Sequence, residues 1–207
     1  MDSNLAETNL RTIRLLMERS ALYRRALAPI MLFAGAFGVL AAAAGILFRV
    51  EAVKPFAALW LGTACVTVAG VFLLARRQAL KDSEPFWSPP TNRVAQALLP
   101  PLLSGLFLGM LLTLLSDSWS VDLPMALVWL LFYGCALHSA GFFMVRGIKW
   151  FGWIFIGGSM ILMFLVLGLK VSIKPLTAHW VMGIFFGLLH LAYGAYLYVT
   201  EKKNSVA

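Results

Sequence analysis

The chain has 207 residues, of which 61% are hydrophobic and only 13% charged. Soluble domains carry about 25% charged residues, so this composition excludes an ordinary soluble domain and predicts an integral membrane protein. The net charge of +8 would suggest a nucleic-acid partner in a soluble protein. Here the basic residues lie in short connections between apolar runs, so we expect membrane topology to explain them and no nucleic acid to bind.

The first element in the chain is a predicted amphipathic helix, within residues 1–26. Its apolar residues recur at helical spacing on one face, and its charged residues occupy the opposite face. We expect it to lie on the inner surface of the membrane. Its charged face would contact anionic lipid headgroups or a cytoplasmic regulatory protein. The residues of that face and its borders are Arg11, Arg14, Glu18, Arg19, Arg24 and Arg25.

Six apolar segments follow within residues 27–200. A helix that crosses the hydrocarbon core needs about 20 mostly apolar residues. The segments that meet this length are 28–48, 56–75, 94–115, 123–145, 151–169 and 177–199. Because the connections are short, neighbouring helices should run antiparallel. We therefore predict an all-α fold, a six-helix transmembrane bundle, ending in a cytoplasmic tail at 201–207.

The orientation of the bundle follows from its basic residues. Most of the 17 Lys and Arg lie before the first segment, in the second and fourth connections, or in the tail. The opposite side carries only Arg49, Lys54, Lys170 and Lys174. Since cytoplasmic loops are enriched in Lys and Arg, we predict that both termini are cytoplasmic.

The third segment contains two adjacent prolines, Pro100 and Pro101. Each lacks an amide donor, so we expect the helix to bend or unwind there. A structural kink is one interpretation, and a break that lines a cavity is the other.

Two histidines lie within a near-repeat. "FYGCALHSAG" at 132–141 and "FFGLLHLAYG" at 185–194 each place a histidine between two glycines seven residues apart. An intramembrane histidine is costly beside lipid, so His138 and His190 should face the bundle interior. The glycines that flank them would allow either close helix packing or a flat ligand. The glycines are Gly134, Gly141, Gly187 and Gly194.

Three functions remain open for this pair of histidines. The leading hypothesis is a non-enzymatic protein that binds a small apolar ligand, lipid or partner helix where the fourth and sixth segments meet, with Tyr133 and Tyr193 beside the histidines. The second is a b-type haem protein for electron transfer, with His138 and His190 as axial ligands. The third is a small facilitator or transporter subunit.

The sequence shows no catalytic signature, and no cofactor is predicted under the leading hypothesis. No apolar segment carries an acidic residue, which disfavours an ion-coupled transporter. Ser159 and His190 would form a catalytic pair only within hydrogen-bond reach of each other. His179 lies near the outer end of the sixth segment, where we expect an interface residue.

Three stretches resemble a group of small bacterial inner-membrane proteins that have six predicted spans and no known activity. They are "MERSALYRRA" at 17–26, "WLLFYG" at 129–134 and "GLLHLAYG" at 187–194. Some members of that group look similar to proteins encoded near winged-helix transcriptional regulators. The resemblance implies a location in the bacterial inner membrane and a regulatory or sensory association, and it supplies no functional residues.

Overall fold

The structure, a computed structural model, describes residues 26–81, 83, 85–115, 122–168 and 176–204. Six of its helices are long and apolar enough to cross a membrane, and the described residues contain no strand. The predicted all-α bundle of six transmembrane helices is therefore confirmed. The predicted amphipathic helix, with its charged residues from Arg11 to Arg25, lies outside the described residues.

The six spans follow one another in chain order. The first is the helix Ala26–Leu47, and the next four are α2 (Val53–Lys81), α3 (Pro89–Leu114), α4 (Asp122–Ala140) and α5 (Arg146–Gly168). The sixth is one continuous span made of α6 (Thr177–Met182), η2 (Gly183–Leu188) and α7 (Leu189–Asn204).

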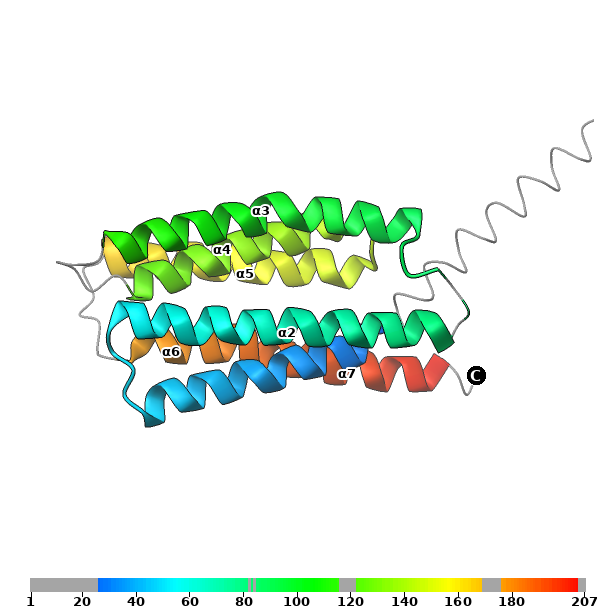
Figure 1. The fold of residues 1–207 in the computed structure, drawn as a ribbon, viewed down its shortest axis with the longest axis horizontal. Coiled ribbons are helices and arrows are strands. Elements are labelled where there is room, and N and C mark those ends of the chain that lie inside the picture. The colour runs from blue at the N-terminus through cyan, green and yellow to red at the C-terminus, as the bar shows by residue number, and fades with distance from the viewer. Residues whose placement is uncertain (1–25, 82, 84, 116–121, 169–175, 205–207) are drawn as a thin grey trace, which may run out of the picture.

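The spans form two groups that lie side by side (Figure 1). One group contains α3, α4 and α5, in which α4 packs against both neighbours. The other contains α2, the helix Ala26–Leu47 and the sixth span. All helix axes run close to parallel with the long axis of the molecule, as expected for consecutive spans with short connections.

Several helix ends differ from the segments that hydrophobicity predicts, among them the starts of α3 and α5 and the end of the sixth span. Helix α2 continues to Lys81, six residues beyond the predicted end, and α4 ends at Ala140, although the apolar sequence runs on to Val145. After α4 the chain turns, with the Phe143 amide donating to the Ala140 carbonyl at 2.9 Å. Hydrophobicity predicts which residues can lie in the hydrocarbon core, but it does not predict the residue at which a helix ends and the backbone turns.

The proline pair does not interrupt α3. The helix runs from Pro89 to Leu114 with Pro100 and Pro101 inside it. The expected unwinding is therefore absent. Leu102, immediately after the prolines, faces a cavity described below.

Candidate functional site

The best-defined polar contact inside the bundle joins Tyr133 of α4 to His190 of the sixth span. The Tyr133 hydroxyl lies 2.8 Å from His190 Nε2, and His190 Nδ1 lies 3.0 Å from the carbonyl oxygen of Phe185. Because a carbonyl oxygen can only accept, Nδ1 carries the hydrogen and Nε2 of the neutral ring accepts from the Tyr133 hydroxyl. Both ring nitrogens are thereby satisfied in a side chain that is only 1% exposed.

Aromatic rings surround this Tyr133–His190 pair. The His190 ring centroid lies 5.0 Å from that of Phe151, 5.5 Å from Phe155 and 6.1 Å from Phe186. Tyr133 packs on Phe155 and Phe186 at 5.1 and 4.9 Å. Such aromatic pairs each contribute about 0.5–1.5 kcal/mol beyond area burial. Since the rings come from α4, α5 and the sixth span, the cluster ties the two groups of helices together.

The sixth span changes its helical pitch next to the pair. Residues Gly183–Leu188 form the π-helix η2, and the Leu189 amide donates to the Ile184 carbonyl five residues earlier. Short π-helical turns are rare and occur often at functional sites. The apolar stretch "GIFFGL" suits an α-helix and a π-helix equally well, so sequence periodicity did not reveal this feature.

Gly187 and Gly194 lie where the sixth span meets the helix Ala26–Leu47. A Cβ atom added to Gly187 would stand 2.9 Å from the Val39 nitrogen, and one added to Gly194 would stand 2.9 Å from the Leu32 nitrogen. Backbones approach this closely only where side chains are absent. These glycines therefore serve helix packing and do not border an open space.

Gly134 and Gly141 lie against α5 and not against the sixth span. A Cβ atom on Gly134 would stand 2.8 Å from the Ile156 nitrogen, and one on Gly141 would stand 2.8 Å from Lys149 Cα. Each glycine pair of the near-repeat thus brings its helix close to a neighbour in the same group.

The two histidines lie in separate aromatic clusters. His138 packs against Phe142 and Trp153, with ring centroids 5.4 and 5.1 Å away, and neither ring belongs to the cluster around His190. Buried His138 Nδ1 has no hydrogen-bond partner among the described residues. Tyr133 and His138 are five residues apart, which is about 140° around a helix. When Tyr133 faces the sixth span, His138 therefore faces elsewhere.

Tyr193 joins the sixth span to α5. Its ring stacks on Phe151 at 4.8 Å, and its hydroxyl packs against Gly147.

The sequence predicted eight ligand-binding residues, and the structure joins two of them, Tyr133 and His190. Of the other six, the four glycines and Tyr193 lie at contacts between helices, and His138 packs against Phe142 and Trp153.

His179 is buried and is not an interface residue, so that expectation is wrong. It is 1% exposed; its Nε2 donates to the Val50 carbonyl at 2.9 Å, and its Nδ1 accepts from Trp60 Nε1 at 3.2 Å. The chain after the first helix folds back, with the Val50 amide donating to the Gly45 carbonyl. This turn brings the Val50 carbonyl over His179, which no local sequence pattern indicates.

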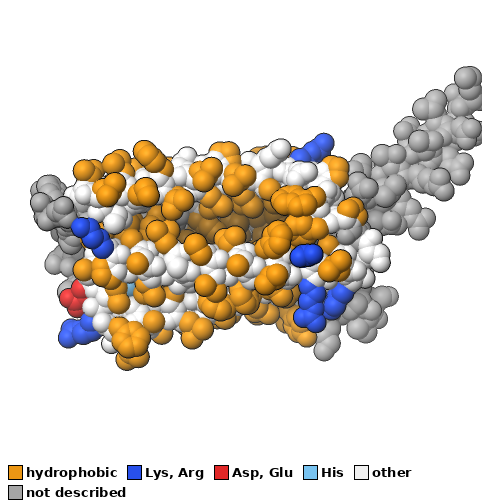
Figure 2. Space-filling view, viewed as in Figure 1, with side chains coloured by type: hydrophobic (Ala, Val, Ile, Leu, Met, Phe, Trp, Pro, Cys, Tyr) orange, Lys and Arg blue, Asp and Glu red, His pale blue; other side chains and the backbone are white. Residues whose placement is uncertain are grey.

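A cavity of about 880 Å³ lies between α2 and α3. Figure 2 shows it as a hollow between the two groups, lined by hydrophobic side chains. We call it the α2–α3 cleft. Its side walls include Ala64, Val68 and Phe72 of α2 and Leu102, Gly105 and Leu106 of α3. Its back wall includes Trp129, Phe132, Tyr133, Phe186 and His190.

The α2–α3 cleft is open on the flank of the bundle. Its wall residues Val68, Phe72 and Leu106 are 67%, 44% and 46% exposed. On the flank of a transmembrane bundle, such apolar surface faces lipid. The volume lies in the range of about 300–1,000 Å³ that is typical of small-molecule sites. Sequence reasoning found part of the back wall but missed the side walls, because nothing distinguishes their apolar residues from others on the same helices.

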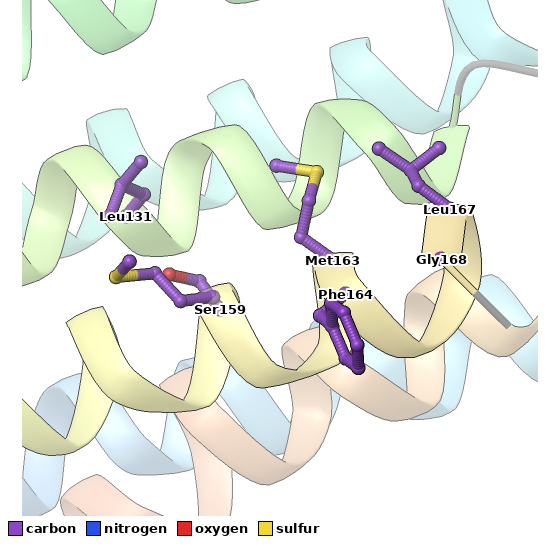
Figure 3. A pocket seen from close by; sticks show the side chains of 7 residues that line it. Leu131, Ser159, Met163, Phe164, Leu167 and Gly168 are labelled. Atoms are coloured by element: carbon purple, nitrogen blue, oxygen red, sulfur yellow. The ribbon is translucent and has the colours of Figure 1, made fainter.

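A second cavity of about 490 Å³ runs along α5 (Figure 3). Met163, Phe164 and Leu167 line it together with Ser159. The Ser159 hydroxyl donates to the Ile156 carbonyl of its own helix at 2.8 Å. Ser159 and His190 thus each bond to other groups, and they do not form the pair that a hydrolytic mechanism needs.

The arrangement of His138 and His190 does not fit the haem alternative. An axial ligand needs a free ring nitrogen, whereas both nitrogens of His190 are hydrogen-bonded and the two histidines lie in different clusters. Within the described part of the chain, no group of three or more His, Cys, Asp or Glu is placed to hold a metal ion.

Comparisons with protein-family models, with curated proteins and with solved structures found no match to this chain. Its own geometry is therefore the basis for a functional assignment.

Proposed function

We propose that this chain is a non-enzymatic membrane protein that binds one apolar molecule from the bilayer in the α2–α3 cleft. The observation that carries the proposal is the cleft itself, a hollow of about 880 Å³ that opens sideways between two membrane-crossing helices. Tyr133 and His190 at its back belong to the contact between the fourth and sixth spans, where the sequence predicted a ligand.

The chemistry of the cleft favours an apolar ligand. Its side walls are almost entirely hydrophobic. At its back, Tyr133 and His190 already bond to each other, and the buried indole nitrogen of Trp129 has no hydrogen-bond partner among the described residues. An apolar molecule leaves the bond between Tyr133 and His190 intact. Because the ligand comes from lipid and not from water, shape and van der Waals contact supply the affinity. The Tyr133 oxygen keeps a lone pair that can accept a hydrogen bond from a ligand hydroxyl.

The interior offers little to an ion. Among the described residues the fully buried polar side chains are Ser159, His179 and His190, and each makes a hydrogen bond inside the protein. In that part of the chain, the buried side-chain atoms without a partner are two ring nitrogens, His138 Nδ1 and Trp129 Nε1. Because the three fully buried side chains are already hydrogen-bonded, they are not available to coordinate an ion, which favours an apolar ligand over a charged one.

A sensory consequence of binding stays a prediction. Two segments would report it to a cytoplasmic partner: residues 4–25, which lie outside the described residues, and residues 76–93, which are described except for 82 and 84.

Photolabelling in the membrane tests the proposal. The full chain in phosphatidylcholine nanodiscs is irradiated with a diazirine-bearing hexadecanol, and mass spectrometry maps the labelled residues. We expect label on Ala64, Val68 and Leu106 to exceed label on Ile161, which is 63% exposed on α5 and lines neither cavity. If the cleft is labelled no more than Ile161, it is ordinary lipid-facing surface and the proposal fails.

A variant that fills the cleft provides the matched control. Ala64→Phe places a ring in the cleft, whereas Ala58→Phe makes the same change at an exposed position of α2 that does not line it. We expect Ala64→Phe to reduce cleft labelling at least fivefold and Ala58→Phe to leave it unchanged. Equal effects of the two variants would contradict binding in the cleft.

A further inference from the structure

The α2–α3 cleft leads toward a basic end of the bundle. Its α2 wall runs from Trp60 to Leu73, a distance of about 20 Å along the helix. Arg76 and Arg77 follow within one turn of Leu73 on the same helix, and both are exposed. Figure 2 shows Lys and Arg side chains gathered at this end, where α2 ends and α3 begins.

Aromatic residues border the cleft at this end. Phe72, a wall residue, packs edge-on against Phe86 at 4.9 Å, and Phe86 packs against Trp87 at 5.3 Å. Trp87 is 61% exposed. Exposed tryptophan is enriched at the level of lipid headgroups, so this end of the cleft lies near the membrane surface.

The arginines at this end are available to an anion. Arg76 and Arg77 of α2 and Arg93 of α3 are exposed, and none of them forms an ion pair with a described carboxylate. The acidic residues of the connection, Asp82 and Glu84, lie outside the described residues. The three arginines come from the two helices that form the side walls of the cleft.

The opposite end of the cleft is closed. Trp60 is 4% exposed, and its indole nitrogen donates to His179. Phe56, one turn further along α2, is completely buried and packs on both Trp60 and His179. The cleft is therefore a groove that is blind at one end, open along its side, and next to positive charge at its other end.

We infer that the occupant of the α2–α3 cleft is an anionic membrane lipid, with a hydrocarbon chain in the cleft and its headgroup phosphate held by Arg76, Arg77 and Arg93. The inference rests on the proposed function, and it adds the chemical class of the ligand. A blind apolar groove matches a chain that ends inside it, and arginine matches a phosphate by charge and by paired donors. The lateral opening lets the lipid enter without leaving the bilayer.

Native mass spectrometry tests this inference. The full chain is reconstituted with equal amounts of phosphatidylglycerol and phosphatidylcholine, and the lipids that stay bound after detergent extraction are counted. We expect the wild-type chain to retain phosphatidylglycerol in preference to phosphatidylcholine. In Arg76→Gln/Arg77→Gln the preference should fall about fivefold for each arginine removed. Inorganic phosphate should not displace the lipid, since it lacks the chain.

A charge control and the cleft-filling variant separate the outcomes. Arg49→Gln/Lys54→Gln removes two charges at the opposite end of the bundle and should leave the lipid preference unchanged. If Ala64→Phe abolishes retention of both lipids but the preference is the same in all charge variants, the anionic-lipid inference is wrong and the proposed function stands. If Ala64→Phe retains both lipids as the wild type does, both proposals fail.

Discussion

Tyr133 and His190 illustrate how a membrane helix keeps a polar side chain away from lipid. The histidine uses one nitrogen on the Phe185 carbonyl of its own span and the other on the hydroxyl of a facing helix. His179 uses the same arrangement, with the Val50 carbonyl and the Trp60 indole as partners. In both cases two complementary partners hold the neutral ring in one tautomer.

Removing the Tyr133 hydroxyl should destabilise the protein. Tyr133→Phe keeps the ring in its aromatic cluster but leaves buried His190 Nε2 without a donor. We expect a loss of about 1 kcal/mol in the free energy of unfolding, since hydrogen bonds between membrane helices contribute about 0.6–2 kcal/mol. Unfolding in mixed micelles with increasing denaturing detergent measures the change.

Tyr198→Phe is the control for that measurement, because Tyr198 is 61% exposed near the end of the sixth span. It should leave the unfolding free energy unchanged. If both variants lost the same amount, the bond between Tyr133 and His190 would contribute nothing to stability.

At the scale of helices, close contacts between glycine-bearing faces hold each group of spans together. Gly35 shows this on the first helix, because a Cβ atom there would stand 2.6 Å from the Leu191 nitrogen and 2.9 Å from the Gly187 carbonyl oxygen. Both neighbours are backbone atoms and cannot move without shifting a helix. The glycines beside the two histidines are therefore explained by helix packing.

Adding one methyl group to that contact should separate the helices. We expect Gly35→Ala to reduce the unfolding free energy by about 1–3 kcal/mol, the usual cost of overpacking. Gly62→Ala is the matched control, since an added Cβ there has no neighbour within 4 Å. The control should be neutral or slightly stabilising, because alanine is a better helix former than glycine. A thermal shift of equal size in both variants would contradict this account of the packing.

At the scale of the whole molecule, the division into two groups of spans creates the α2–α3 cleft. α4 packs closely on α5 and contacts α6, and aromatic rings of α5 pack on the sixth span. In contrast, α2 and α3 make few contacts although they are consecutive in the chain. The gap between them remains open because the rest of the bundle is held together elsewhere, at the aromatic cluster and the glycine contacts.

The orientation of the molecule can be tested at the same scale. The positive-inside rule predicts that the end carrying Arg76, Arg77 and Arg93 faces the cytoplasm. In a full-length variant without native cysteines, we expect Ala52→Cys to react with a membrane-impermeant maleimide in intact spheroplasts. Ser83→Cys, in the connection at the opposite end, should react only after lysis. The reverse pattern would invert the predicted topology.

Much of this fold could be predicted from composition alone. The number of spans and the all-helical class follow from the hydrophobicity of each segment, which does not depend on the other segments. The uneven distribution of basic residues between the connections can also be read directly from the sequence. The histidine–glycine near-repeat drew attention to the fourth and sixth spans, where Tyr133 and His190 are in contact. The glycines of the repeat and His138 pack against other neighbours.

Tertiary structure alone decided how each helix is rotated about its axis. In a soluble helix a polar face marks the outside, but α4 and the sixth span are apolar on nearly every side, so their sequences do not show which face turns inward. Packing placed Tyr133 toward His190 and turned His138 away, buried His179 beneath a distant carbonyl, and left α2 and α3 apart. These outcomes depend on contacts between residues far apart in the chain, which local composition does not encode.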